Sequence, residues 1–253
     1  MDINKALSFV RDDPRWKDKF WPGATINFVF IPSFAAWGYM LETLTNVANG
    51  VALPMPEWTN FSGNWRKGLD LFVIRLIYGI VPLLLLCCGG FAFFSAGGAA
   101  ILGLSSQRET QGLAASLAGI LPILLGCLAC VFVLLILLLW ILEPAIVLQY
   151  ATTGQIGAAF KFGDMFRFIS SNLGDYAMAV IIPFIVPLIV VIPFACISGI
   201  LGIIPIIGII FSIVFSIVQA VLMFTLSFYL EMLRAHLYGQ LLRASQSQVA
   251  TTG

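Results

Sequence analysis

Four long apolar stretches constrain this chain more than any other feature. They cover residues 69–104, 113–150, 176–200 and about 203–233, and about 20 apolar residues suffice for a helix to cross a bilayer. Of the 253 residues, 60% are hydrophobic and 10% are charged, whereas a typical soluble domain is about 45–50% apolar and about 25% charged. A water-soluble fold could not cover its surface with so few polar groups. The sequence therefore predicts an all-α integral membrane protein.

A fifth apolar stretch, residues 24–40, is short, and Pro32 interrupts it. It either crosses the membrane as a kinked span or enters and returns. Ahead of it, Asp13-Pro14 predicts the end of one surface helix and the start of the next. Asn49-Gly50 predicts a helix end after the stretch. No cleavable signal peptide is expected, because the opening residues are charged and acidic and no small-residue cleavage site follows.

The distribution of basic residues decides between five spans and four. With five spans, six basic residues lie on each side of the membrane. With four spans, Arg108 lies outside, Arg75 snorkels from the first span, and the other eleven are cytoplasmic: Lys5, Arg11, Arg15, Lys17, Lys19, Arg66, Lys67, Lys161, Arg167, Arg234 and Arg243. Because cytoplasmic loops carry an excess of Lys and Arg, we predict four transmembrane helices in the inner (cytoplasmic) membrane. Both termini are then cytoplasmic, and the N-terminal hydrophobic segment is re-entrant or interfacial.

Two amphipathic segments, residues 51–68 and 151–173, precede the two pairs of apolar stretches. Pro56 suits a helix start in the first segment. The first segment carries Trp58 and Trp65, and tryptophan is enriched where membrane meets water. The second has an apolar face that includes Phe162 and Phe166 and a polar face opposite. Both are therefore predicted to be interfacial helices on the cytoplasmic side. The expected aromatic anchors are Trp16, Trp21, Trp58, Phe61, Trp65, Phe162 and Phe166.

The two halves of the chain share a short signature. Ile80-Val81-Pro82-Leu83 recurs 105 residues later as Ile185-Val186-Pro187-Leu188, and each follows an aspartate, Asp70 or Asp175, by the same distance. Two such units with the same orientation make a parallel repeat; chance similarity among apolar segments is the alternative. We predict a single membrane domain, 1–253. It comprises an N-terminal segment (1–50), repeat 1 (51–155), repeat 2 (156–242) and a flexible tail (243–253).

Several short blocks resemble an uncharacterised prokaryotic family of polytopic membrane proteins, the domain-of-unknown-function family 4013. The blocks are Ala6-Leu7-Ser8-Phe9, Asp13-Pro14-Arg15-Trp16, Gly38-Tyr39, Leu53-Pro54, Glu57-Trp58, Gly68-Leu69 and His236-Leu237-Tyr238-Gly239-Gln240. They spread over most of the chain, although Pro-Met-Pro-Glu-Trp stands where the family is expected to have Leu-Pro-Glu-Trp. The resemblance implies a multi-pass architecture and adds no activity, cofactor or catalytic residue.

Ionisable groups inside spans are costly and are therefore functional candidates. The intramembrane polar candidates are Arg75, Glu143, Gln219, Glu231 and Arg234. Arg75 and Glu143 lie at matching depths and are a predicted pair, and Glu231 and Arg234 are three residues apart on one helix. Alternatively, all four snorkel to the interface or fasten helix ends. Gln219 is more readily an interhelical hydrogen bond than a ligand.

No pattern of catalytic or metal-binding residues is present in the sequence. His236 is the single histidine, and Cys127 and Cys130 form a CxxC inside an apolar run without His or carboxylate nearby, as small packing residues do. No phosphate loop, Ser-His-Asp set or iron–sulfur spacing occurs. We therefore expect no catalytic residues, no metal and no cofactor. The net charge of +1 gives no reason to expect nucleic acid as a partner.

These observations favour a non-catalytic multi-pass membrane protein. It would be a structural or assembly component at the cytoplasmic leaflet, as a homo-oligomer or as a subunit of a larger membrane complex, with membrane lipids as partners. The alternative is a small transporter or channel for an apolar solute or lipid, which the repeat and the prolines in the spans favour. A membrane-surface enzyme is the least favoured, because acid, base and nucleophile do not cluster.

Overall fold

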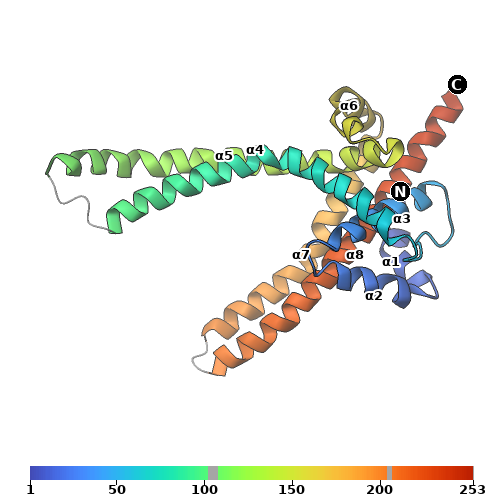
Figure 1. The fold of residues 1–253 in the computed structure, drawn as a ribbon, viewed down its shortest axis with the longest axis horizontal. Helices are drawn as coiled ribbons and strands as arrows, with labels where there is room; N and C mark the ends of the chain where they lie inside the picture. The colour runs from blue at the N-terminus through green and yellow to red at the C-terminus, as the bar shows by residue number, and fades with distance from the viewer. Residues whose placement is uncertain (102–107, 204–206, 253) are drawn as a thin grey trace. The chain divides into compact units, whose positions relative to one another are not determined.

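The structure, a computed structural model, describes the backbone of residues 1–101, 108–203 and 207–252, and the side chains of 1–90, 123–200, 211 and 213–247. Its elements there are all helical, with no strand in the described ranges (Figure 1). They are α1 (Ile3–Asp12), α2 (Trp16–Ile26), α3 (Ser33–Ala48), α4 (Phe61–Ile101), α5 (Arg108–Thr153), the 3-10 helix η1 (Ile156–Phe160), α6 (Phe162–Ser171), α7 (Leu173–Ile203) and α8 (Ile207–Thr252).

Four helices are long and apolar enough to cross a membrane, as predicted. The candidate spans are Phe61–Gly90 in α4, Ile123–Thr153 in α5, Leu173–Ile200 in α7 and Ile213–Ser247 in α8. Length and composition therefore make this a multi-pass α-helical membrane protein. The helix α3, with 16 residues, is shorter than the roughly 20 residues that a span requires.

The chain forms two compact units. The first unit combines Met1–Ile74 with Pro144–Gly253, and the second unit is Arg75–Glu143. In the second unit, parts of α4 and α5 run side by side (Figure 1), and Gly89 lies close to the side chain of Leu128. The core of the first unit is the contact of α3 with α8, where the fully buried side chains are those of Tyr39, Met40, Leu44, Phe228, Met232 and Leu237.

The N-terminal apolar stretch is broken into two helices. α2 ends at Ile26, residues 27–32 turn, and α3 begins at Ser33. The predicted ends are confirmed: α1 stops at Asp12, before the proline, and Gly50 has φ +75° after α3. α2 begins at Trp16, two residues later than the Asp13-Pro14 pattern predicts, because the Asp13 carboxylate accepts the Arg15 backbone N–H at 2.9 Å and holds a turn there.

One further expectation is wrong. No helix starts at Pro56: α4 begins at Phe61, with the Asn60 side chain accepting the Gly63 N–H at 3.1 Å. The 54–58 segment is held outside a helix by hydrogen bonds to its backbone carbonyls from Lys19 and Tyr39. The tail expected from residue 243 is helical to Thr252, because α8 continues through it.

Some expectations fall outside the described residues. They concern residues 102–107, which include part of the polar loop predicted after the first span. They also concern the turn at 204–206 and the side chain of Arg108. The second amphipathic segment is described throughout, and in it α6 is a separate helix ahead of α7. The first segment has no separate helix, since α4 runs from Phe61 into the span without a break.

Candidate functional site

The predicted intramembrane groups contact one another. In the second unit, Arg75 Nη2 lies 2.8 Å from Glu143 Oε1, with 26% and 19% of the two side chains exposed. On α8, Arg234 Nη1 lies 3.2 Å from Glu231 Oε1. Such pairing lowers the cost of a charge near the apolar layer. In both pairs the two side chains satisfy part of each other's hydrogen-bonding capacity, which stabilises the structure. The pairing itself brings no nucleophile next to either pair.

Gln219 is placed between two spanning helices. Its Oε1 lies 3.3 Å from Ser198 Oγ, so a polar contact links α8 to α7. Interhelical hydrogen bonds of this kind contribute about 0.6 kcal/mol on average in membranes. The amide therefore fastens two helices together.

A second polar link was missed by sequence reasoning. Tyr150 donates its hydroxyl hydrogen to Asp70 Oδ2 at 2.8 Å, which joins the end of α5 to the start of α4 within the first unit. The sequence offers Asp70 only as the first residue of a repeat signature. Its partner is 80 residues away, and no local pattern indicates a contact at that separation.

The aromatic anchors divide into two groups. Trp21, Phe61, Phe162 and Phe166 are exposed, as anchors require. Trp58 and Trp65 are instead tied to the N-terminal helices, because their indole N–H groups donate to the carbonyls of Lys19 (2.7 Å) and Ile31 (3.1 Å). Trp16 packs edge-on against Phe20.

A buried ion pair fixes the same region. Asp13 and Lys19 are 2% and 5% exposed, and Lys19 Nζ lies 2.7 Å from Asp13 Oδ2. Lys19 Nζ also donates to the Met55 carbonyl at 2.9 Å. Burial acts to raise the pKa of Asp13, but the hydrogen bond and charge of Lys19, with the Arg15 backbone N–H, outweigh it and hold the pKa below its usual value. Asp13 is therefore ionised at neutral pH.

Two helices cross at unusually close range beside this pair. A Cβ on Gly38 of α3 would overlap the Asn64 backbone of α4, and one on Gly68 would overlap the Phe34 carbonyl. The Asn64 side chain is fully buried at this crossing, and neither of its polar atoms has a hydrogen-bond partner in the described chain. Burying such a group without a partner costs about 1–3 kcal/mol. The crossing therefore requires glycine at both positions and buries a polar side chain without a partner.

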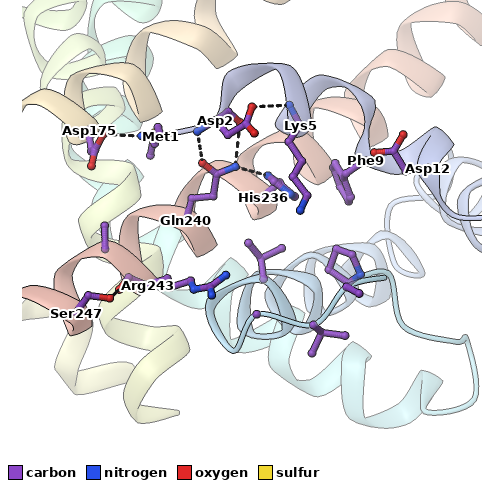
Figure 2. Close-up of a pocket in the computed structure, with 16 residues that line it drawn as sticks. Met1, Asp2, Lys5, Phe9, Asp12, Asp175, His236, Gln240, Arg243 and Ser247 are labelled. Atoms are coloured by element: carbon purple, nitrogen blue, oxygen red, sulfur yellow. Dashed lines mark hydrogen bonds and ion pairs between the residues drawn. The ribbon is translucent and has the colours of Figure 1, made fainter. Parts of the chain in front are cut away.

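One cavity of the first unit has a volume of about 500 Å³ and is lined by both charged and apolar residues. Figure 2 shows that its labelled side chains come from α1, the start of α7 and the last turns of α8. The polar residues lining it are Asp2, Lys5, Asp12, Asp175, His236, Gln240, Arg243 and Ser247. The end of α3 adds Val47, and the loop after α3 adds Gly50, Val51, Ala52 and Pro54. A cavity that offers both charges and an apolar wall is suited to binding a small polar or amphiphilic molecule.

One histidine in this cavity is held in a defined orientation. His236 is 3% exposed, its ring centroid lies 4.5 Å from that of Phe9, and its Nδ1 lies 2.9 Å from Gln240 Nε2. Gln240 is oriented by Asp2, whose backbone N–H donates to Gln240 Oε1 at 2.7 Å and whose carbonyl accepts from Gln240 Nε2 at 3.0 Å. Among the described residues, no group of three or more His, Cys, Asp or Glu could hold a metal.

Comparison with known proteins places the chain in one family. No curated protein and no solved structure matches it significantly. The model of the family described as protein of unknown function (DUF4013) matches residues 23–199. That range includes α3, α4, α5 and α6, and excludes most of the cavity residues. The match spans more than two thirds of the sequence, so the chain belongs to the DUF4013 family of proteins of unknown function.

Proposed function

We propose that this protein is a non-catalytic multi-pass membrane component that assembles, as a homo-oligomer or as a subunit of a larger complex, at the cytoplasmic leaflet. The observation that supports this proposal most is that the chain itself buries very few residues of its spans. In the apolar windows of α5, α7 and α8, 0%, 6% and 6% of the residues are buried. These helix faces contact lipid or other membrane helices, and helix association in membranes depends on such packing.

The arrangement of polar groups favours this role over catalysis. The ionisable residues near the span ends are paired with one another, as for Arg75 with Glu143 and Arg234 with Glu231. The described thiols, Cys87, Cys88, Cys127, Cys130 and Cys196, are free and lie in apolar spans. A nucleophile needs an adjacent base or a perturbed environment to act, and the described groups supply no such set.

The shape of the N-terminal segment supports four spans and a re-entrant hairpin. The turn between α2 and α3 exposes Phe28, Val29, Phe30 and Ile31. The Phe28 ring lies 4.5 Å from that of Phe224 inside the α8 span, so the turn reaches membrane depth. With this hairpin entering and returning on one side, the charge distribution puts both termini in the cytoplasm. A membrane-impermeant thiol reagent should then label cysteine introduced at Lys17 or Arg167 only in inverted vesicles.

Native mass spectrometry of the protein released in lipid nanodiscs tests the assembly role. We expect a homo-oligomer of fixed stoichiometry or a defined complex with other membrane proteins. A monomer at all concentrations, in nanodiscs of native lipid, would contradict the proposal. Crosslinking in intact membranes is the control, because it detects a complex that extraction has dissociated.

A small transporter or channel for an apolar solute or lipid is the second candidate. Its specific support is the set of prolines inside spanning helices, Pro82 in α4 and Pro183, Pro187 and Pro193 in α7. Pro82 and Pro187 occupy matching positions in the proposed parallel repeat, and repeated broken helices are typical of transporters. A monomer that retains one reproducible apolar molecule in native mass spectra would favour transport over assembly.

A further inference from the structure

We propose that the cavity between α1, the loop after α3 and the end of α8 binds a headgroup that carries both an amine and a phosphate, of the phosphoethanolamine class. The inference deepens the proposed function, because it names a lipid headgroup that this protein would hold at the cytoplasmic leaflet. The argument rests on three groups of side chains that line the cavity: two cations with a histidine, three carboxylates, and an apolar wall.

The cations provide the phosphate half of the site. Lys5 and Arg243 both line the cavity and are exposed to it, and neither side chain forms an ion pair with a carboxylate in the described part of the chain. The Arg243 guanidinium lies beside Gly50, where a Cβ would come within 3.3 Å of its central carbon. Guanidinium groups bind phosphate through parallel N–H donors. Two cations from separate helices therefore converge on one space.

His236 adds a neutral donor to the same half. Because the Asp2 N–H fixes the Gln240 carbonyl oxygen, the Gln240 amide nitrogen faces the imidazole and Nδ1 must accept. The proton of the neutral ring then sits on Nε2, which has no hydrogen-bond partner among the described residues. Figure 2 shows the imidazole between Gln240 and Lys5. This N–H can therefore donate to a ligand oxygen in the cavity.

The carboxylates provide the amine half of the site. Three of them line the cavity together with three cationic groups, Lys5, Arg243 and the Met1 amine, so the formal charge is 3 − 3 = 0. Asp2 Oδ1 accepts the Lys5 backbone N–H at 2.9 Å, and Asp175 Oδ1 accepts from the Met1 amine at 3.2 Å. Among the described residues, Asp12 Oδ2 accepts the Ser8 hydroxyl, at 3.2 Å. A ligand with an ammonium close to its phosphate keeps this neutral site neutral, whereas a phosphate alone would leave it with a net negative charge.

The remaining wall of the cavity is apolar and would contact the part of the ligand that lies nearest the membrane. Val47, Val51, Ala52 and Pro54 line it, next to the last turns of the α8 span. This wall suits the glycerol and the first acyl carbons of a phospholipid, which a soluble amine–phosphate lacks. A phospholipid and a soluble amine–phosphate would both present phosphoethanolamine to this cavity. The apolar wall favours the phospholipid.

The test measures lipid retention by the full-length chain in mixed nanodiscs that contain phosphatidylethanolamine, phosphatidylcholine and phosphatidylglycerol in equal amounts. Native mass spectra should show phosphatidylethanolamine retained about tenfold over each of the others, the ratio that about 1.4 kcal/mol of selectivity gives. Soluble O-phosphoethanolamine, added at increasing concentration, separates the sources. Displacement only at high millimolar concentration supports a lipid site, and displacement at micromolar concentration assigns the site to a soluble amine–phosphate instead.

Paired variants localise the effect. Lys5→Gln with Arg243→Gln should abolish the selectivity, whereas the matched control Lys17→Gln with Arg167→Gln removes two exposed cations elsewhere and should leave it unchanged. A thermal unfolding temperature equal to that of the wild type shows that the first pair remains folded; if it does not, Asp12→Asn is the second, milder variant. Equal retention of the three lipids, preference for phosphatidylglycerol, or equal effects of the two pairs would overturn the site.

The same spectra keep the two proposals separate. A monomer that retains phosphatidylethanolamine would contradict the assembly role and leave the headgroup site standing. An oligomer without lipid selectivity would contradict the headgroup site alone.

Discussion

Replacing Lys19 with methionine tests the buried ion pair that fastens the N-terminal helices. Methionine keeps an unbranched apolar stem but removes the ammonium that lies 2.7 Å from the Asp13 carboxylate and 2.9 Å from the Met55 carbonyl. Asp13 would remain 2% exposed with a charge that only the Arg15 backbone N–H, at 2.9 Å, still contacts. Removing one partner of a buried pair costs about 3–5 kcal/mol, and this remaining contact places the expected loss near the lower end, about 3 kcal/mol.

The companion variant is Asp13→Asn together with Lys19→Met. It removes both charges and keeps an oxygen that accepts the Arg15 N–H, so the double variant should be more stable than the single one by about 1–2 kcal/mol. The matched control is Arg15→Gln, which breaks an ion pair whose side chains are 66% and 45% exposed. Surface pairs contribute about 0–1 kcal/mol, so this control should stay close to the wild type.

Thermal unfolding in detergent, followed by tryptophan fluorescence, is a suitable assay because Trp58 donates to the Lys19 carbonyl. For a chain of this length about 1 kcal/mol shifts the midpoint by about 2–4 °C, so Lys19→Met should lower it by about 6–12 °C. A single variant within about 2 °C of the wild type, or a double variant less stable than the single, would refute the reasoning.

The pH dependence of the same pair has a defined sign. The folded state holds the pKa of Asp13 below its usual value, and the unfolded carboxyl titrates near about 3.9. The stabilisation is therefore complete above the unfolded pKa and is lost as the pH falls through the folded pKa. The wild type should lose more stability than the double variant between neutral pH and about pH 3.

Three further predictions address other contacts. Gly38→Ala should destabilise the protein by about 1–3 kcal/mol through overpacking, whereas Gly79→Ala, with open space around its Cβ, should be neutral or stabilising in thermal unfolding. Glu143→Gln should lower the midpoint of thermal unfolding if the ion pair with Arg75 stabilises the second unit, and the double variant that exchanges Arg75 and Glu143 should then recover it. If Arg75 instead snorkels alone, Glu143→Gln should leave expression and fold intact. Trp58→Phe should cost about 1 kcal/mol, the net worth of one hydrogen bond, measured by the same unfolding assay, and an unchanged midpoint would contradict the role of the indole N–H.

The spans and helix ends could be predicted because they depend on local properties. An apolar run long enough to cross a bilayer is a property of neighbouring residues, and so are a proline that stops α1 and a glycine with positive φ after α3. The pairing of Arg75 with Glu143 was within reach because both lie at the same depth in adjacent spans.

The start of α4 could not be predicted, since distant side chains decide it. Pro56 is a suitable first residue for a helix in isolation, but Lys19 and Tyr39 bind the carbonyls around it. The cavity was invisible for the same reason: Asp2 and Gln240 are 238 residues apart in the sequence and meet only because α1 packs against α8. Local patterns carry no information on contacts at that separation.

The packing of α3 against α8 also sets the order in which the protein can mature. α3 ends at Ala48 and α8 begins at Ile207, so about 160 residues must be synthesised between them, which takes on the order of 10–30 s at ribosomal speed. During that time Tyr39, Met40 and Leu44, which α8 later buries, face lipid or the insertion machinery. A chain that is released before α8 has been made therefore leaves these α3 side chains without the helix that buries them.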